Sequence, residues 1–318
     1  ITLEGGSASH AVQTAEIMKR FEPVVTDFGP DYVLVVGDVN STIACGLVAV
    51  KLGVKLIHVE AGLRSFDRGM PEEVNRVLTD SISDLLFVTE QSGVDNLKNE
   101  GVNHDKVHLV GNVMIDTLLS NRDKAAQSDI LDRMDLAPKA FAVITLHRPS
   151  NVDDLAGLEK IIAAFEVIQT ELKLVFPIHP RTRNNIAGTD LQARVEAMEN
   201  LILLDPVGYL DFLKLTANAA LVMTDSGGIQ EETTILGVPC MTLRKNTERP
   251  VTITEGTNRL VDLTTEAILE AYNDLKAKNF TLAAAAPKLW DGEAAKRIAE
   301  IILNSYTAGF DQKPLKCL

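Results

Sequence analysis

The sequence predicts an α/β fold in which parallel strands are joined by helices and the chain is divided into two halves. Short runs rich in β-branched residues alternate with amphipathic segments along the chain. At about 150 residues a domain, the 318 residues correspond to two domains. The runs are apolar on both faces, which is typical of buried parallel strands. We expect nine strands, at residues 32–36, 55–59, 85–88, 107–109, 141–146, 173–177, 201–204, 221–224 and 238–243.

Helices are expected between these strands. In the first of them, apolar residues such as Ile17, Phe21 and Val24 recur at three- and four-residue spacing. Gly29 and Pro30 then end the helix, because glycine is favoured just beyond a helix and proline cannot continue one.

The domain boundary is expected in the polar stretch at residues 124–139. This predicts an N-terminal domain at 1–135, a C-terminal domain at 136–290, and a helix and tail at 291–318. The last helix buries three isoleucines on one face, Ile298, Ile301 and Ile302.

The composition excludes several classes of protein. A chain that is 46% hydrophobic and 24% charged is neither disordered nor collagenous. With a net charge of −13 and scattered basic residues, nucleic acid is not an expected partner. Three widely spaced cysteines favour a reducing compartment, and no apolar run reaches the roughly 18 residues of a membrane span. We therefore expect a cytoplasmic protein that does not bind a membrane.

The start of the chain suggests a further expectation. Because the chain starts at Ile1, without a methionine, and soon enters a helical pattern, we expect that a segment precedes it in the full protein.

The strongest candidate for an anion-binding site follows the strand at 221–224. Ser226, Gly227 and Gly228 form a tight turn at the start of a helix, where a phosphate can approach backbone N–H groups and the positive end of the helix dipole. The alternative is that Asp225 or Ser226 simply caps the helix. Arg249, beyond the next strand, would add a fixed positive charge to the same anion.

Three carboxylates follow strands of the first half and are candidates for proton transfer. Asp38 and Glu60 come directly after two strands, and Glu72 begins the next helix after Pro71. Carboxylates that cluster raise one another's pKa, which suits acid and base catalysis. The alternative is that Asp38 only caps the helix that follows it, and that Glu72 and Glu73 complement the dipole of the helix that begins at Pro71.

Two histidines also follow strands. His147, with Arg148 beside it, would face the anion-binding loop if the two halves close together, whereas His179 is more typical of a structural histidine. The sequence contains no metal-binding pattern such as His-Glu-x-x-His, and it lacks the glycine-rich patterns of nicotinamide and P-loop sites. No metal and no cofactor are therefore expected.

Taken together, these motifs resemble the family of non-hydrolysing UDP-N-acetylglucosamine 2-epimerases. The resemblance covers nearly the whole chain and lies in an ordered set of motifs: Gly37-Asp38, His58 to Arg64, Met70 to Arg76, Gly111-Asn112 with Ile115-Asp116, His147-Arg148, Asp225 to Glu232, and Thr247 to Pro250. It implies a glycosyltransferase-B-like fold of two Rossmann-like domains with the active site in the cleft between them. It also implies a homodimer.

The resemblance further implies an isomerase that interconverts UDP-GlcNAc and UDP-ManNAc for polysaccharide synthesis. A base removes the C2 proton as UDP leaves C1, and UDP adds back to the resulting glycal. Asp38, Glu60 and Glu72 are the expected acid and base groups, with Asp38 and Glu72 preferred as bases. His147 is the fourth expected catalytic residue and would act on the departing diphosphate. The residues expected to bind UDP are Arg148, Ser226, Gly227, Gly228 and Arg249. By resemblance alone, Phe212 stacks on uracil and Glu232 binds the ribose hydroxyls.

The sequence departs from the family in three places. The family's first strand and its Gly-Thr-Arg-Pro-Glu turn have no counterpart here, an Arg-Gln pair of an allosteric substrate site reads Val12-Gln13, and a Tyr-Gly-Asp-Gly turn is reduced to Trp290-Asp291-Gly292. Four alternatives therefore stay open: a hydrolysing epimerase, an epimerase of a related UDP-sugar, a glycosyltransferase of the same fold, and a non-catalytic UDP-binding fragment.

Overall fold

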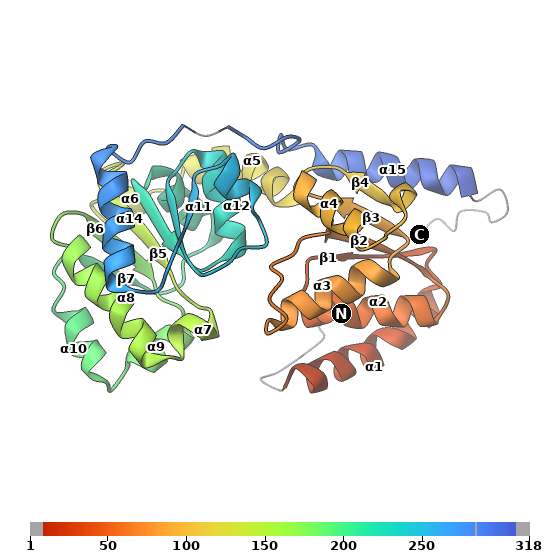
Figure 1. The fold of residues 1–318 in the computed structure, drawn as a ribbon, viewed down its shortest axis with the longest axis horizontal. Coiled ribbons are helices and arrows are strands. Elements are labelled where there is room, and N and C mark those ends of the chain that lie inside the picture. Colours follow the sequence, from red (N-terminus) through yellow and green to blue (C-terminus); the bar gives the residue numbers. More distant parts are fainter. Residues whose placement is uncertain (1–8, 284, 310–318) are drawn as a thin grey trace. The chain divides into compact units, whose positions relative to one another are not determined.

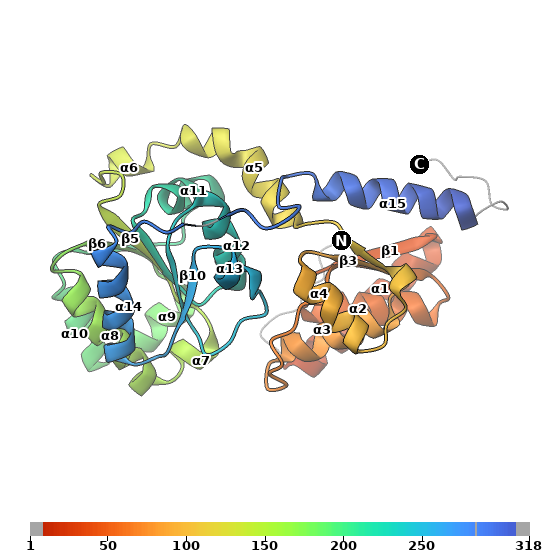
Figure 2. The same cartoon turned by 45° about the horizontal axis from the view of Figure 1, so that its top comes forward.

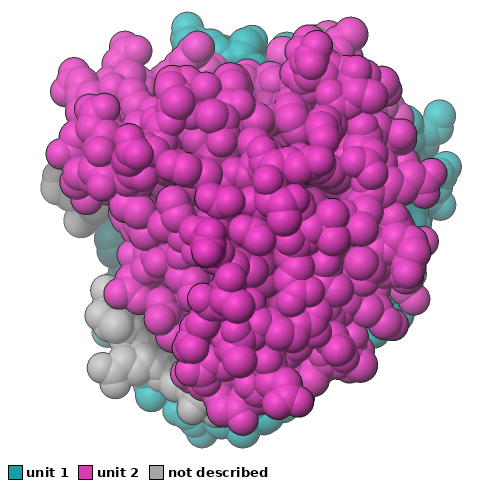
Figure 3. Space-filling view, turned by 90° about the vertical axis from the view of Figure 1, so that its left-hand side faces the viewer, with its two compact units in different colours: residues 1–116, 288–318 teal, residues 117–287 magenta. Residues whose placement is uncertain are grey.

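The computed structural model describes residues 9–283 and 285–309. The chain divides into two compact units, unit 1 with Ile1–Asp116 and Lys288–Leu318, and unit 2 with Thr117–Pro287 (Figure 3). Each unit contains a parallel β-sheet with helices packed against it (Figures 1 and 2). The predicted α/β fold with parallel sheets is therefore confirmed.

Unit 1 contains a four-stranded sheet in the order β1-β2-β3-β4. Its strands are β1 (Tyr32–Val36), β2 (Lys55–Ala61), β3 (Leu85–Val88) and β4 (Val107–Leu109). The helices of this unit are α1 (His10–Phe28), α2 (Asn40–Lys51), α3 (Pro71–Ile82), α4 (Gln91–Asn99), the 3-10 helix η1 (His104–Lys106) and α15 (Ala294–Gly309).

Helices cover the two faces of this sheet unequally. Val33 and Val35 of β1 pack with residues of α1 and α2, whereas the opposite face packs Ile57 and Val59 against Ile298 of α15. The apolar residues of that cluster include Tyr32 but neither Leu34 nor Val36, which are 46% and 48% exposed. The expectation that every strand is buried on both faces is thus wrong for β1, because α15 packs over β2 and β3 on this face and leaves Leu34 and Val36 uncovered.

Unit 2 contains a six-stranded sheet in the order β10-β9-β8-β5-β6-β7. Its strands are β5 (Phe141–Thr145), β6 (Lys173–Pro177), β7 (Leu201–Leu204), β8 (Leu221–Thr224), β9 (Cys240–Leu243) and β10 (Asn258–Val261). Its helices are α6 (Ile130–Arg133), α7 (Pro149–Val152), α8 (Leu155–Ile168), α9 (Pro180–Ile186), α10 (Asp190–Glu196), α11 (Tyr209–Asn218), α12 (Gly227–Leu236), α13 (Val251–Thr254) and α14 (Thr265–Ala277). Alternate residues of the central strand β5 enter two different core clusters, Ala142 and Ile144 in one, Phe141 and Val143 in the other.

The nine predicted strands are confirmed, with small differences at their ends. β2 continues to Ala61, and β9 begins at Cys240 rather than at residue 238. β10 was missed, because Asn258 and Arg259 interrupt the apolar pattern of that strand. The predicted first helix ends as expected, with Gly29 in the left-handed conformation.

The two units divide the chain at a different place from the expected domain boundary. The division falls after Asp116, whereas the polar stretch placed it after residue 135. Helix α5 (Val113–Ala126) crosses the division, and its Leu118 and Ala125 pack with Leu213 of unit 2. The C-terminal helix is not separate but belongs to unit 1, where Ile298 joins the core.

The loop after β2 lies against the start of α4 and requires a glycine. Gly62 has φ +80°, and a Cβ atom there would lie 2.5 Å from the carbonyl oxygen of Gly93. The backbone contact leaves no room for even a methyl group. The loop that follows β2 is therefore fixed in position by a close approach of two backbones.

We predict that Gly62→Ala destabilises unit 1 by about 2–5 kcal/mol, since it combines a left-handed conformation with a steric clash. Gly101→Ala is a matched control, because Gly101 has φ +79° and a Cβ atom there would meet no other atom within 4 Å. It should cost only about 1–2 kcal/mol. The fluorescence of Trp290, the single tryptophan, which is buried in unit 1, measures both variants during urea unfolding. Equal losses would contradict the steric argument.

Candidate functional site

The first candidate carboxylate, Asp38, lies just beyond β1 and is held by an arginine of α3. Its Oδ2 accepts hydrogen bonds from Arg76 Nε at 3.1 Å and from Arg76 Nη2 at 2.5 Å. Asn75 of the same helix donates to the carbonyl oxygen of Asp38 at 2.9 Å. The Asp38 side chain nevertheless keeps 25% of its surface exposed. It is therefore fixed in orientation and still open to a ligand.

Glu60 lies at a distortion of β2. It has φ 69°, unusual for a residue with a side chain, and the register of β2 with β3 shifts between Val59 and Ala61. A Cβ atom on Gly37 would lie 3.5 Å from Glu60 Oε2, so the Glu60 carboxylate lies beside the loop that carries Asp38. The bulge thus directs Glu60 toward that loop.

The adjacent glutamates of α3 have different surroundings. Glu73 is buried; its Oε2 accepts from Ser65 N and Oγ and from Arg76 Nη1, and its Oε1 accepts from Phe66 N, all at 2.7–2.9 Å. Glu72 is half-buried. Glu72 also shares a face of α3 with Asn75, since residues three apart on a helix are neighbours. Asp38 and Glu60 therefore lie at the same edge of the sheet, Glu72 lies on the helix whose Asn75 and Arg76 hold Asp38, and Glu73 fixes the loop.

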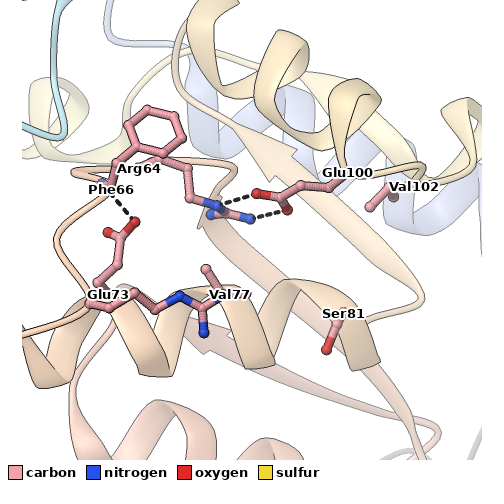
Figure 4. A pocket seen from close by; sticks show the side chains of 8 residues that line it. Arg64, Phe66, Glu73, Val77, Ser81, Glu100 and Val102 are labelled. Carbon is pink, nitrogen blue, oxygen red and sulfur yellow. Dashed lines mark hydrogen bonds and ion pairs between the residues drawn. The ribbon is translucent and has the colours of Figure 1, made fainter.

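A pocket of about 370 Å³ lies between the loop after β2, helix α3 and the residues just after α4 (Figure 4). It is lined by Arg64, Phe66, Arg68, Glu73, Val77, Ser81, Glu100 and Val102. Figure 4 shows the Arg64 guanidinium paired with Glu100 and the Glu73 carboxylate bonded to the Phe66 backbone. None of the three candidate carboxylates lines it.

In unit 2, His147 forms a pair with a buried aspartate that the sequence indicates only as a possible helix cap. His147 Nδ1 lies 2.9 Å from Oδ1 of Asp225, which is completely buried. Asp225 also accepts from the backbone N–H groups of His147 and Arg148 and from Asn151 Nδ2. The proton on Nδ1 is therefore held by Asp225, and Nε2 is the nitrogen left for a ligand. The His147 side chain is 45% exposed.

The predicted anion-binding turn forms the start of α12. Ser226 is the N-cap residue, its side chain makes no capping bond, and Gly227 and Gly228 open the helix. The first N–H groups of a helix have no partner within it, and here no capping side chain takes one of them. The residues are therefore arranged as an anion site requires.

Arg249 is committed to carboxylates. Its Nε lies 2.6 Å from Glu231 Oε1, and its Nη1 bonds to Glu248. A Cβ atom on Gly227 would lie 2.6 Å from both Arg249 Nη1 and Glu248 Oε1. The expectation that Arg249 supplies a net positive charge to an anion thus needs modification, because Arg249 lies at the turn but is paired with two glutamates.

A second pocket, of about 200 Å³, lies at the strand ends of unit 2. Its lining residues are Thr145, Leu146, His147, Pro177, His179, Pro206, Val207 and Phe212. Phe212 and His147 are thereby brought to one cavity. His179, expected to be structural, caps α9 through Nδ1 but also lines this pocket, with its ring centroid 6.2 Å from that of His147.

Glu232 lies on α12 and is buried, with 5% of its surface exposed. Burial raises the pKa of its carboxyl to about 6, although the Tyr209 hydroxyl, which donates to Oε1 at 3.4 Å, acts to lower it. Glu232 is thus ionised at neutral pH and titrates just below it.

The described residues include no group of three or more His, Cys, Asp or Glu side chains that could hold a metal ion. Within residues 9–283 and 285–309, no helix is both long and apolar enough to cross a membrane.

The fold and the strand-end residues define a two-unit α/β protein of the glycosyltransferase-B type. The solved sucrose-phosphate synthase of Thermosynechococcus elongatus shares this fold at 14% identity, with a TM-score of 0.64 over 97% of this chain and 84% of that one. A family model for UDP-N-acetylglucosamine 2-epimerase matches residues 1–303. The chain belongs to this family.

Individual relatives agree with this assignment. A UDP-N-acetylglucosamine 2-epimerase homolog of Methanococcus maripaludis is 44% identical over 94% of this chain and 83% of its own length. A UDP-2,3-diacetamido-2,3-dideoxy-D-glucuronate 2-epimerase of Pseudomonas aeruginosa is 39% identical over 95% of this chain and 82% of its own. The crystal structure of the Methanocaldococcus jannaschii UDP-GlcNAc 2-epimerase in complex with UDP-GlcNAc and UDP has a TM-score of 0.87 at 39% identity, over 94% of this chain and 83% of that one.

We predict that Gly227→Ala destabilises the protein by about 1–3 kcal/mol, because the new methyl group displaces the Arg249 and Glu248 side chains. Gly208→Ala is the control: Gly208 is the N-cap residue of α11 and has open space around it. Its cost should stay below about 1 kcal/mol. Calorimetric unfolding compares the two, and an equal effect would show that the turn accommodates a side chain.

Proposed function

We propose that this chain is a non-hydrolysing UDP-GlcNAc 2-epimerase that interconverts UDP-GlcNAc and UDP-ManNAc, without a metal or cofactor. Membership of the family carries this proposal, together with the placement of Asp38 beside Glu60 and of Glu72 on the helix that holds Asp38. The reaction breaks the C2–H and C1–O bonds to give a glycal and UDP, then re-forms both bonds with the proton on the other face of C2.

Unit 1 supplies the groups for proton transfer. Removing and restoring a proton on opposite faces of one carbon requires more than one acid or base. Asp38 and Glu72 are the proposed C2 bases, since Asp38 is oriented by Arg76 and both side chains keep exposed surface. Glu60, beside the Asp38 loop, orients the site or relays the proton.

Unit 2 binds UDP and stabilises it as the leaving group. The diphosphate lies at the start of α12, on the Ser226 hydroxyl and the N–H groups of Gly227 and Gly228, with Arg148 and Arg249 close to the same turn. His147 donates from Nε2 to the departing diphosphate, with Asp225 fixing its tautomer. The helix N–H groups and His147 matter most when the C1–O bond breaks.

The nucleoside part has two proposed contacts in unit 2. Phe212, in the pocket with His147, stacks on uracil, and the Glu232 carboxylate accepts hydrogen bonds from the ribose hydroxyls. In this proposal the catalytic carboxylates lie in the expected N-terminal domain at 1–135. The residues that bind UDP lie in the expected C-terminal domain at 136–290.

The remaining assignments follow from the resemblance and the composition. We propose a cytoplasmic homodimer whose partner molecule is a UDP-sugar, with neither nucleic acid nor membrane involved. Light scattering after size-exclusion chromatography measures the oligomeric state directly.

A second candidate substrate is a more elaborate UDP-sugar. The Pseudomonas aeruginosa relative at 39% identity is named for a diacetamido uronic acid. Assays with both substrates separate the two, and release of free ManNAc with UDP would instead indicate a hydrolysing epimerase.

We predict that incubation with UDP-GlcNAc in deuterium oxide places deuterium at C2 of the product. Asp38→Asn and Glu72→Gln should each lower kcat by about 10²–10⁴-fold while leaving UDP affinity nearly unchanged, because they remove proton transfer and not the leaving-group site. Asp95→Asn, an exposed acid on α4, is the control. Unlabelled product would refute the glycal route, and near-normal activity in both variants would refute the choice of bases.

We predict that affinity for UDP-GlcNAc falls about fivefold as the pH drops from 7 to 5, since protonation of Glu232 replaces a charge-assisted acceptor with a neutral one. The raised pKa of about 6 places the loss in this interval, with binding stronger above it. UDP-GlcNAc is the suitable probe, because its diphosphate is esterified at both ends and lacks a terminal phosphate that titrates near pH 6. Isothermal titration of Glu232→Gln should give a flat profile; an unchanged slope would assign the effect to another group.

A further inference from the structure

A group of four ionisable side chains, three of them buried, lies beside the loops that carry the candidate carboxylates. His58 lies on β2, Arg64 in the loop after it, Asp80 near the end of α3, and Glu100 just after α4. We call these four residues the His58 cluster. His58, Arg64 and Asp80 are almost completely buried, and Glu100 closes the cluster at the surface.

Both ring nitrogens of His58 face oxygen atoms that accept hydrogen bonds. Nδ1 lies 2.6 Å from Asp80 Oδ1, and Nε2 lies 2.9 Å from the carbonyl oxygen of Gly37. A carbonyl oxygen cannot donate, so Nε2 carries a proton. The position of the second proton, on Nδ1 or on Asp80, then decides the charge of the ring.

Asp80 is surrounded by donors that favour its ionised form. Its Oδ2 accepts from Arg64 Nη1 at 2.7 Å and from Gly62 N at 3.0 Å. Burial lowers the pKa of the Arg64 guanidinium, but its bonds to Glu100 and its ion pair with Asp80 outweigh burial and raise it. Arg64 also forms two bonds to Glu100, as Figure 4 shows. With Arg64 charged and bonded to Asp80, the second proton belongs on His58 Nδ1.

This assignment balances the charges of the cluster. Two cations, His58 and Arg64, then face two anions, Asp80 and Glu100. A neutral His58 that keeps its proton on Nε2 would instead place the lone pair of Nδ1 2.6 Å from an oxygen of the ionised Asp80, with no proton between the two atoms.

We propose that His58 is a doubly protonated imidazolium that positions Asp38 through the carbonyl oxygen of Gly37. The positioning role rests on the proposed function of Asp38. Gly37 has φ +70°, and its N–H donates to Val59 O at 3.1 Å. His58 thus holds the backbone on one side of Asp38, while Arg76 holds its carboxylate.

The protonation state is tested by nitrogen NMR of the full chain at neutral pH. The chain has 6 histidines, so the His58 signals are assigned by their loss in His58→Gln. We expect both ring nitrogens at shifts typical of protonated nitrogen. One nitrogen at the shift of an unprotonated ring nitrogen would overturn the imidazolium.

The positioning role is tested by two amides that each replace one of the two hydrogen bonds. In His58→Gln the side-chain N–H₂ reaches the position of Nε2 and keeps the bond to Gly37. In His58→Asn it reaches the position of Nδ1 and keeps the bond to Asp80. We expect His58→Asn to lower kcat about a hundredfold and His58→Gln less than about tenfold, with KM similar in both.

Stability should follow the opposite order, because His58→Asn preserves the buried pair with Asp80. A purely structural role for His58 would make kcat and stability fall in the same order, and that result would overturn the proposal. His108→Gln is the control, since His108 is another histidine of unit 1, half-buried and placed on β4. It should leave kcat unchanged.

The proposal also has a test that needs no activity. Hydrogen exchange of the Gly37 amide measures opening of the loop, and we expect it to be faster in His58→Asn but not in His58→Gln. If the wild-type chain has no epimerase activity, the proposed function fails while this measurement still decides the positioning of the loop. Equal exchange in the two variants would overturn the positioning role.

Discussion

The buried carboxylates of Asp80 and Asp225 each receive hydrogen bonds from the loop that follows a neighbouring strand. Asp80 binds Gly62 N and the Arg64 side chain after β2, and Asp225 binds the N–H groups of His147 and Arg148 after β5. A buried carboxylate without donors is strongly destabilising, so each of these loops must stay closed on its aspartate. The positions of the loops after β2 and β5, and of the candidate residues in them, depend on this constraint.

The partners and the burial of each acid separate the acids that hold the structure from those that are available for chemistry. Glu73 has four donors and is buried, and Glu231 and Glu248 are paired with arginines. Asp38 keeps exposed surface despite its bond to Arg76. The sequence alone does not reveal which of Glu72 and Glu73 holds the structure, because both lie in the first turn of α3. The two side chains point in different directions around the helix, and only the one at Glu73 is buried.

The sequence predicted much of the fold, since apolar runs and glycine positions are local signals. Nine strands and the end of α1 followed from them, whereas β10 was missed because Arg259 breaks the apolar run. The strand-end rule also located Asp38, Glu60 and His147. It could not find the partner of His147: Asp225 is 78 residues further along the chain, and only the pairing of β5 with β8 brings the two together. The pairing of Arg249 with Glu231 depends on tertiary structure in the same way.

Backbone strain at Glu60 has a clear physical role. A residue with a side chain in the left-handed region costs about 1–2 kcal/mol, which a glycine at the same place would avoid. The neighbouring loop does use a glycine, Gly37, with a similar φ of 70°. A glutamate in this conformation therefore needs a reason beyond folding, and its carboxylate beside the Asp38 loop provides one. Because the His58 cluster fixes both loops from below, the strained bulge cannot relax without opening a buried network of charges. The rigidity of that network keeps the two carboxylates beside each other.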